Sequence, residues 1–360
     1  MQSVEPREAG GVAAVMPNWL GDFVMSAGAF AALARARAPE RIAALVPRPF
    51  AALARAALPA GEVVGFSLGT GLTRLRGRAR LAAFMRARAY RAAAIFPNSF
   101  GSALAVRLAG TRVRAGTAAH GRSILLTHVV APAGADEHEA DVFARVARAS
   151  LADDDAATGR FEVRASDASM AVPGTLRDGA RALLSREGLD AERESFLAIA
   201  PGAAYGPAKR YGAGNFAEVA REAAARGLRP VLVGGAADAG AAAEVAAGIE
   251  RLRPVDLTGR TDVPELAGVL ALAAGFAGND SGAAHVAAAL GTPTAVLFLS
   301  TDPARTGQRG PRVRLLIAPV ECRPCLRRIC PRGEHVCRDA VRPREVTDAL
   351  GELGAFERRR

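Results

Sequence analysis

The sequence predicts an α/β protein made of two doubly wound domains, each a parallel sheet covered by helices. Short apolar runs alternate with longer alanine- and arginine-rich segments along the whole chain, which is the rhythm of strands joined by crossover helices. With 360 residues, the chain exceeds what one hydrophobic core usually organises. Hydrophobic residues make up 50% of the chain, which is enough for two packed cores.

Seven apolar runs are expected to form strands: VAAVM (12–16), RIAALV (41–46), AAAIF (92–96), FLAIA (196–200), PVLVGG (230–235), GFAGN (275–279) and TAVLFL (294–299). Between about 163 and 195 the strand rhythm lapses around a helix-like stretch, which we interpret as a linker. We therefore expect a first domain at 1–172, a second at 173–344, and a C-terminal helix with a basic tail at 345–360. Ligands of open α/β sheets bind at the carboxyl ends of strands, so a cleft between the domains is expected.

The net charge is +11 and Lys209 is the only lysine. Composition alone leaves two interpretations equally open, a coding bias towards arginine and alanine or an anionic partner. The N-terminus lacks the apolar core of a signal peptide, and no apolar run approaches the roughly 20 residues that cross a bilayer. The four cysteines cluster between Cys322 and Cys337, unlike those of a secreted disulfide scaffold. We expect a cytoplasmic location.

The second domain opens with a loop that has the composition of an anion site. After the strand at 196–200 it reads P-G-A-A-Y-G-P-A-K-R, in which Gly202, Ala203 and Ala204 let backbone amides approach an anion. Lys209 adds positive charge to this loop. The Walker spacing is absent, and an ordinary loop with exposed cations is equally compatible with this stretch.

A second loop, G-N-D-S-G-A-A-H, follows the strand at 275–279. Asp280 or Ser281 can cap the helix that begins there, which is a purely structural role. The amides of Ser281 and Gly282, together with the positive end of the helix dipole, could instead bind a diphosphate or a sugar. His285 lies about one turn into the helix, and it either faces the same ligand or packs in the core.

The pair Gly21-Asp22 lies where the first strand gives way to the first helix. Asp22 is either a carboxylate that the helix dipole favours or a general base facing the cleft. Gly21 leaves the chain without a side chain at a point where a ligand can come close.

Five motifs, in order from about residue 12 to residue 345, resemble those of the ADP-heptose:lipopolysaccharide heptosyltransferases. They are P-N-W-L-G-D, F-P-N-S-F, P-G-A-x-x-G-P-A-K-R, G-N-D-S-G-A-x-H and S-T-D-P-x-R-T-G. The resemblance implies a GT-B glycosyltransferase with two Rossmann-like domains that face each other across a cleft. It also implies an inverting transfer that relies on protein cations and helix dipoles, so no cofactor and no metal ligand are expected.

The resemblance assigns the acceptor to the first domain and the chemistry to Asp22. The acceptor would be heptosyl-Kdo-lipid A, whose hydroxyl Asp22 would deprotonate as that hydroxyl attacks the donor sugar. Gly21 would leave room for the sugar, and three further residues would contact the acceptor: Asn98, Ser99 and Arg122.

The second domain would bind ADP-L-glycero-β-D-manno-heptose. By resemblance, the phosphates would contact Lys209, the loop 202–204 and the amides of Ser281 and Gly282, while Asp280 would bind hydroxyls of the heptose. Adenosine would lie near 233–236 and 257–261. The resemblance thus gives these donor-binding residues: Gly202, Ala203, Ala204, Lys209, Thr261, Asp280, Ser281, Gly282 and His285.

An anionic acceptor at a membrane would give the positive charge a use. Arginines crowd one stretch of the first domain, where they either attract the cytoplasmic face of the inner membrane or form a solvated helix face. They are Arg74, Arg76, Arg78, Arg80, Arg86 and Arg88.

The cysteine cluster comprises Cys322, Cys325, Cys330 and Cys337, with His335 nearby. Four thiols in such a short span can close a tetrahedral zinc site, but their spacing is not the paired one of known zinc ribbons. We expect well under one zinc per chain. If zinc does bind, the segment should orient the C-terminal helix without touching the reacting sugar. Removal of the metal should then lower stability and leave the substrate affinity of the folded protein almost unchanged.

Two alternatives remain open at this point. One is a related heptosyltransferase that uses another acceptor or another nucleotide-heptose, although P-N-W-L-G-D and P-A-K-R favour addition of the second heptose. The other is a basic nucleic-acid-binding protein with a cysteine knuckle. Aromatic residues make up only 5% of the chain and do not interleave with its basic stretches, so we expect no nucleic-acid partner.

Overall fold

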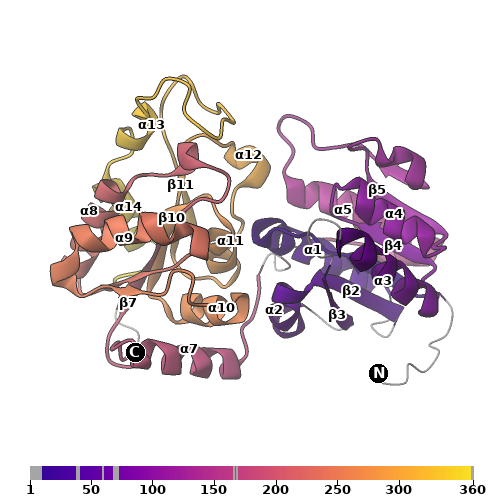
Figure 1. Cartoon of the computed structure of the whole chain (residues 1–360), viewed down its shortest axis with the longest axis horizontal. Coiled ribbons are helices and arrows are strands. Elements are labelled where there is room, and N and C mark those ends of the chain that lie inside the picture. Colours follow the sequence, from indigo (N-terminus) through magenta and orange to yellow (C-terminus); the bar gives the residue numbers. More distant parts are fainter. Residues whose placement is uncertain are drawn as a thin grey trace. The chain divides into compact units, whose positions relative to one another are not determined.

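The computed structural model describes residues 10–37, 41–58, 61–67, 73–164, 167 and 169–357. The chain divides into two compact units, Met1–Ala168 and Ser169–Arg360 (Figure 1). Each unit contains one six-stranded parallel sheet with helices on its faces. The predicted basic tail at 358–360 lies outside the described residues.

The sheet of the first unit has the strand order β3-β2-β1-β4-β5-β6. Its central strand β1 is buried at every position, because its residues are apolar and pair with a strand on each side. The strands are β1 (Val12–Val15), β2 (Ile42–Pro47), β3 (Glu62–Phe66), β4 (Ala92–Ile95), β5 (Val113–Thr117) and β6 (His128–Val130).

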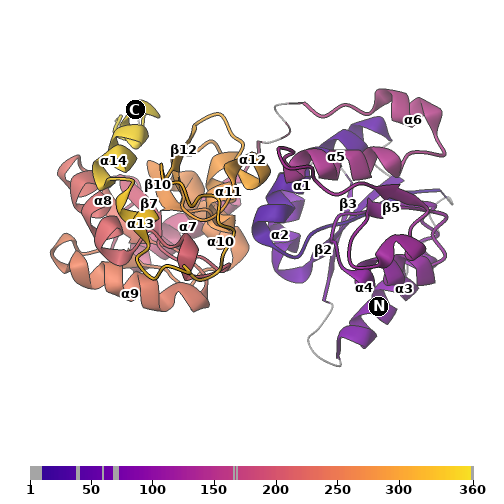
Figure 2. The same cartoon turned by 90° about the horizontal axis from the view of Figure 1, so that it is seen from above.

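Helices cover both faces of this sheet (Figure 2). One core cluster joins Ala13 and Val15 of β1 to Leu81 and Met85 of α3 and to side chains of α4. Helices α1 and α5 pack against each other on the opposite face. The helices are α1 (Leu20–Ala36), α2 (Ala51–Ala57), α3 (Thr73–Ala87), α4 (Phe100–Leu108), α5 (Glu139–Ala149) and α6 (Asp155–Arg160), with short 3-10 turns η2 (Arg48–Phe50) and η3 (Arg122–Leu125).

The sheet of the second unit has the strand order β12-β11-β10-β7-β8-β9. Strands β7, β10 and β11 form its centre, and every residue in them is buried. The strands are β7 (Phe196–Ala200), β8 (Arg229–Leu232), β9 (Val255–Asp256), β10 (Gly275–Asn279), β11 (Thr294–Phe298) and β12 (Val313–Ile317).

Its helices also form two layers. Side chains of α8, α9 and α14 belong to one core cluster, whereas α7, α10 and α11 pack together on the other face (Figure 1). A Cβ at Gly268 would lie 2.4 Å from the carbonyl oxygen of Leu176, so this glycine permits the close crossing of α10 and α7. The helices are α7 (Gly174–Arg186), α8 (Ala213–Ala225), α9 (Ala239–Gly248), α10 (Val263–Leu272), α11 (Gly282–Ala289), α12 (Pro303–Thr306), α13 (Val336–Asp339) and α14 (Pro343–Glu352), with 3-10 turns η5 (Pro207–Lys209), η6 (Ala236–Asp238) and η7 (Glu250–Leu252).

All seven predicted strands are confirmed, with ends that shift by a few residues. The helix-like stretch expected between about 163 and 195 is α7, and the expected C-terminal helix is α14, whose Val346 and Leu350 belong to the core of the second unit. The sequence reading missed β3, β5, β6, β9 and β12. Four of these five are the edge strands of the two sheets.

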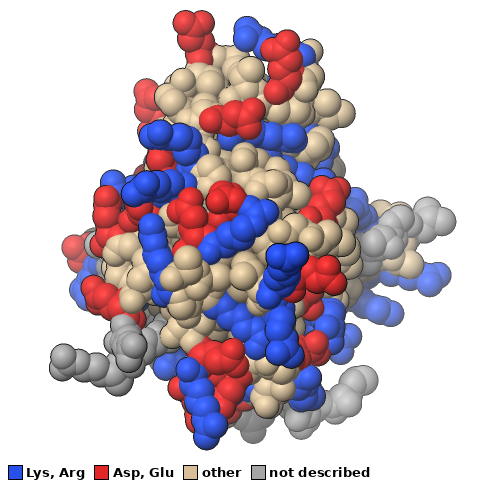
Figure 3. Space-filling model, turned by 90° about the vertical axis from the view of Figure 1, so that its left-hand side faces the viewer, with Lys and Arg blue, Asp and Glu red and all other residues tan. Residues whose placement is uncertain are grey.

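No helix within the described ranges is long and apolar enough to span a membrane. On the face drawn in Figure 3, acidic and basic side chains are interspersed. On that face, the basic side chains therefore lie among carboxylates and do not form one continuous positive patch.

Candidate functional site

Three loops of the second unit meet at the carboxyl edge of its sheet. They follow β7, β10 and β11, and these three strands are neighbours because β10 pairs with both β7 and β11. The loop at 201–210 follows β7 and is named the donor loop because the sequence predicts that it binds the donor. The N-D-S-G loop follows β10, and Ser300-Thr301 follows β11. Sequence-distant residues are thus brought together as the parallel topology requires.

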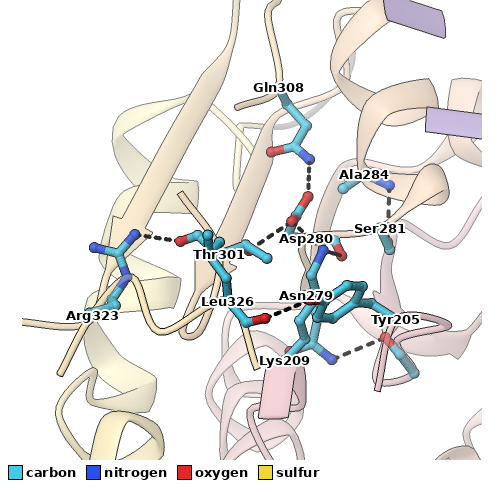
Figure 4. A network of polar contacts seen from close by, with 11 residues as sticks. Tyr205, Lys209, Asn279, Asp280, Ser281, Ala284, Thr301, Gln308, Arg323 and Leu326 are labelled. Carbon is cyan, nitrogen blue, oxygen red and sulfur yellow. Dashed lines mark hydrogen bonds and ion pairs between the residues drawn. The ribbon is translucent and has the colours of Figure 1, made fainter. Parts of the chain in front are cut away.

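Asp280 is the centre of a buried polar network (Figure 4). Its side chain is 5% exposed, and its Oδ2 lies 2.5 Å from the Nζ of Lys209 on the donor loop. The same Oδ2 accepts a hydrogen bond of 2.8 Å from the Thr301 hydroxyl, and its Oδ1 accepts one of 3.1 Å from Nε2 of Gln308. A carboxylate buried this deeply needs such partners, since an unpaired buried charge would cost several kcal/mol.

Asn279 ties the two ends of the donor loop together. Its Nδ2 donates to the carbonyl oxygens of Pro201 (2.8 Å) and Gly202 (3.1 Å), and its Oδ1 accepts from the amide of Tyr211 (2.9 Å). Ser281, rather than Asp280, is the cap of α11, because its hydroxyl accepts from the amide of Ala284 at 3.4 Å. Asp280 is therefore left to bind Lys209.

Gly202 is a glycine for a steric reason. A Cβ at this position would lie 2.0 Å from Oδ1 of Asp238, so only glycine leaves space for that carboxylate. Asp238 in turn accepts a hydrogen bond of 3.0 Å from the amide of Gly235, at the end of the loop that follows β8. Ala203 is buried and Ala204 is exposed.

The two segments predicted to surround adenosine lie side by side. The amide of Gly259 donates to the carbonyl of Gly234 at 2.9 Å, and Gly259 has a φ of 71°, the left-handed conformation that favours glycine. The hydroxyl of Thr258 is buried with no hydrogen-bond partner in the described part of the chain. Thr261 is half-buried and precedes Asp262, the N-cap of α10.

His285 lies in α11 and is 5% exposed. Of the two placements considered from the sequence, the structure has the histidine within the packed part of the unit. Its assignment to donor binding stays a prediction.

In the first unit, Gly21 and Asp22 lie in the first turn of α1, directly after β1. Both are half-buried, whereas the neighbouring Trp19 is 66% exposed. The N-cap residue Trp19 makes no capping hydrogen bond with its side chain, and Asp22 is the acidic residue in the first turn, near the positive end of the helix dipole. The placement at a strand-to-helix junction agrees with the sequence expectation.

The predicted acceptor residues surround a buried arginine. Arg122 is fully buried. Its Nε donates a hydrogen bond to the Thr117 carbonyl (2.8 Å), and its Nη2 donates one to the Thr117 hydroxyl (2.8 Å). The guanidinium also donates to the Pro97 carbonyl and to Oδ1 of Asn98. Burial lowers the pKa of Arg122 to about 10.

Arg122 therefore fixes the loop that carries Asn98 and is enclosed by protein atoms. Asn98 and Ser99 are exposed at the end of β4, next to β1. Ser99 also caps α4, since its hydroxyl accepts from the amide of Ser102 at 3.2 Å. In the structure Arg122 is bonded to the loop of Asn98, and the contact with an acceptor expected for Arg122 from the sequence stays a prediction.

The six arginines of the stretch 74–88, which runs through α3 to the residue after it, divide into two groups. Arg88 pairs with Glu62 at 2.8 Å, Arg86 donates to the Leu108 carbonyl, and the guanidinium of Arg78 lies against Gly101. The remaining three are exposed: Arg74, Arg76 and Arg80.

The four cysteines are free thiols, each half-buried. Burial and the neighbouring thiols Cys322, Cys330 and Cys325 raise the pKa of Cys337. In contrast, the backbone amides of His335 and Arg332 lower the pKa of the Cys330 thiol. Within the described ranges, no three His, Cys, Asp or Glu side chains are grouped so that they could hold a metal ion.

Several residues of the network were not assigned from the sequence. Asn279 and Thr301 lie within the motifs quoted above. The motifs do not indicate that Asn279 would bind the donor loop or that Thr301 would bind Asp280. Gln308 and Tyr205 gave no signal, because their partners are distant in sequence. Only the pairing of strands brings them together.

Comparison with solved structures defines the class of fold. ADP-heptose lipopolysaccharide heptosyltransferase II of E. coli superposes with a TM-score of 0.78 at 24% identity, covering 95% of this chain and 98% of that one. A family 9 glycosyltransferase of Veillonella parvula gives 0.77 at 17% identity, covering 97% and 98%. The α/β, GT-B class predicted from the sequence is confirmed.

Sequence comparison gives the family. Residues 78–335 match the model of glycosyltransferase family 9 (heptosyltransferase), and the chain belongs to this family. Lipopolysaccharide heptosyltransferase 2 of Salmonella typhimurium is 26% identical, over 94% of this chain and 96% of the relative. The chain is thus a glycosyltransferase of the heptosyltransferase type, and the alternative of a nucleic-acid-binding protein is not favoured.

Proposed function

We propose that the protein transfers L-glycero-D-manno-heptose from ADP-L-glycero-β-D-manno-heptose to the first heptose of heptosyl-Kdo-lipid A, with inversion at the anomeric carbon. The observation that carries this proposal is the Lys209–Asp280 pair at the meeting point of the donor loop and the N-D-S-G loop. In this pair, a cation suited to binding phosphate lies beside a carboxylate that can accept hydrogen bonds from sugar hydroxyls. Membership of the heptosyltransferase family supports the same substrates.

The second unit binds the donor. Lys209, the amides of the loop 202–204 and those of Ser281 and Gly282 at the start of α11 contact the diphosphate, where the helix dipole favours negative charge. Asp280 accepts hydrogen bonds from the heptose, and His285 and Thr261 complete the donor site. These groups offset the charge that develops on ADP as it leaves, which lowers the barrier to transfer.

The first unit supplies the base and the acceptor. Asp22 takes the proton of the acceptor hydroxyl while the oxygen of that hydroxyl attacks the anomeric carbon, and the bond from that carbon to the ADP oxygen breaks with its electron pair. Gly21 leaves room for the sugar. Asn98 and Ser99 contact the acceptor, and Arg122 holds Asn98 in place.

An incubation of the purified protein with ADP-heptose tests the proposal. Two acceptors are compared, Kdo-lipid A and heptosyl-Kdo-lipid A, and the products are weighed by mass spectrometry. We expect addition of one heptose to the heptosylated acceptor only. Transfer to bare Kdo-lipid A alone would point to a different acceptor, and no transfer to either would refute the assignment.

The same proposal includes peripheral contact with the cytoplasmic face of the inner membrane, where the acceptor is anchored. Each exposed arginine near an anionic surface contributes about 1 kcal/mol of attraction. Replacing Arg74, Arg76 and Arg80 of α3 by serine should reduce co-sedimentation with phosphatidylglycerol vesicles. The matched control replaces three exposed arginines of the second unit, which should leave sedimentation unchanged: Arg193, Arg342 and Arg344.

A further inference from the structure

The segment that carries the four cysteines, residues 321–338, lies against the donor site. It follows β12, and from the sequence we expected it to orient the C-terminal helix if it bound zinc. The amide of Leu326 donates to the Ser300 carbonyl at 2.8 Å. Nη2 of Arg323 donates to the Thr301 carbonyl at 2.7 Å (Figure 4). The cysteine segment is thus bonded to the residue whose hydroxyl holds Asp280.

The segment also holds the donor loop. The Tyr205 hydroxyl donates to the Leu326 carbonyl at 2.7 Å, and Nε of Arg328 donates to the Tyr205 carbonyl at 2.7 Å. The amide of Ala208 donates to the Arg328 carbonyl at 3.0 Å. A Cβ at Gly206 would lie 2.5 Å from that same carbonyl oxygen, so the close approach of the two segments depends on a glycine.

Tyr205 connects these contacts to Lys209. The Nζ of Lys209 lies 5.1 Å from the centre of the Tyr205 ring, and the guanidinium carbon of Arg328 lies 5.5 Å from it. Both cations are within the range of attraction by an aromatic ring. A lysine has four rotatable bonds, and contact with a ring that is itself fixed at its hydroxyl and its carbonyl restricts where the ammonium group can lie.

We propose that Tyr205 and Arg328 are positioning residues that hold the Lys209 ammonium where it meets the diphosphate of the donor. The inference rests on the proposed function, because it assumes that Lys209 binds phosphate. It gives the cysteine segment a role in donor binding, through Tyr205, without any contact between that segment and the sugar.

The test measures the affinity for ADP by calorimetry, with thermal unfolding as the check on folding. Arg328→Ala and Tyr205→Ala should each weaken ADP binding about five- to thirtyfold, the worth of one or two hydrogen bonds made to well-placed partners. Tyr205→Phe keeps the ring and should lose about threefold. The matched control is Arg327→Ala, an exposed arginine next to Arg328, which should bind ADP within twofold of wild type.

A double-mutant cycle separates positioning from general support of the fold. If Arg328 acts through Lys209, adding Arg328→Ala to a Lys209→Ala protein should change ADP affinity by less than twofold. An equal loss in both backgrounds would overturn the inference, as would wild-type affinity in both Arg328→Ala and Tyr205→Ala. If Lys209→Ala alone has lost ADP affinity, either result still supports the proposed donor site. Wild-type ADP affinity in Lys209→Ala would overturn both the donor assignment and the inference.

Discussion

The two units present their predicted site residues at the carboxyl ends of central strands, but they hold those residues differently. In the second unit the carboxylate of Asp280 is buried, and the half-buried Lys209 and the hydroxyl of Thr301 are both bonded to it. In the first unit the buried charge is that of Arg122, Asp22 is half-buried, and the exposed side chains of Asn98 and Ser99 are neutral.

This difference matches the two tasks that we propose. A diphosphate donor needs charges that are already in place, because their reorganisation during transfer would raise the barrier. A large acceptor needs exposed hydrogen-bonding groups on a rigid support and one base at the reacting hydroxyl. Substitutions in the two units should therefore fail in different ways.

The largest expected effect is that of Asp22→Asn on turnover. The amide cannot take the proton from the acceptor, so the rate of transfer should fall by roughly a hundred- to ten-thousandfold while the fold is kept. Steady-state kinetics with heptosyl-Kdo-lipid A measures this loss. Asp141→Asn is the matched control, since Asp141 also lies in the first turn of a helix of the same unit, and it should turn over like wild type.

Lys209→Ala should act on the donor instead. Loss of a charge-assisted phosphate contact costs about 1.5 to 3 kcal/mol, which corresponds to a roughly 10- to 100-fold higher KM for ADP-heptose. The KM for the acceptor should change little. An unchanged donor KM would mean that Lys209 serves only to neutralise Asp280.

Arg122→Gln should first affect stability. It leaves the carbonyls of Pro97 and Thr117 without their buried donors, so the free energy of unfolding should fall by about 3 kcal/mol in urea titrations. The KM for the acceptor should rise because Asn98 is no longer held. Arg112→Gln, at an arginine whose side chain is 75% exposed, should change the free energy of unfolding by less than about 0.5 kcal/mol. Equal stability of the two variants would contradict the account of the buried arginine.

The smallest expected effect distinguishes two thiols. The pKa of Cys330 is lowered and that of Cys337 is raised, so near pH 7 a larger fraction of Cys330 is the reactive thiolate. Iodoacetamide should label Cys330 faster, and the difference should narrow as the pH rises towards 9. Tryptic peptides 329–332 and 333–338 separate the two sites for mass spectrometry, and faster labelling of Cys337 would contradict the assignment.

The strands that could be predicted from the sequence are those buried on both faces of the sheet. All seven predicted strands are interior strands, which read as continuous apolar runs. The edge strands β3, β6, β9 and β12 are short or carry polar residues. The interior strand β5, VRAGT, is also interrupted by polar residues. None of these five strands forms a continuous apolar run in the sequence.

The site was predictable where one strand and its loop carry the information. Lys209 was predicted as a site residue because it is a cation in a loop of small residues that follows a strand. Asp280 was predicted because it lies in N-D-S-G, between a strand and a helix. Their direct pairing did not follow, nor did the bonds from Thr301 and Gln308, because these depend on which strands are neighbours. The burial of Arg122 could not be predicted from the sequence either, because its partners Pro97 and Thr117 are recognised only when the pairing of β4 with β5 is known.

The central claim, that the second unit binds the donor and the first supplies the base, is tested most directly by calorimetric titration of ADP into Asp22→Asn and Lys209→Ala. We expect Asp22→Asn to bind ADP with wild-type affinity although it has lost transfer, and Lys209→Ala to bind ADP roughly 10- to 100-fold more weakly. Loss of ADP affinity in Asp22→Asn, or wild-type ADP affinity in Lys209→Ala, would contradict this division of labour.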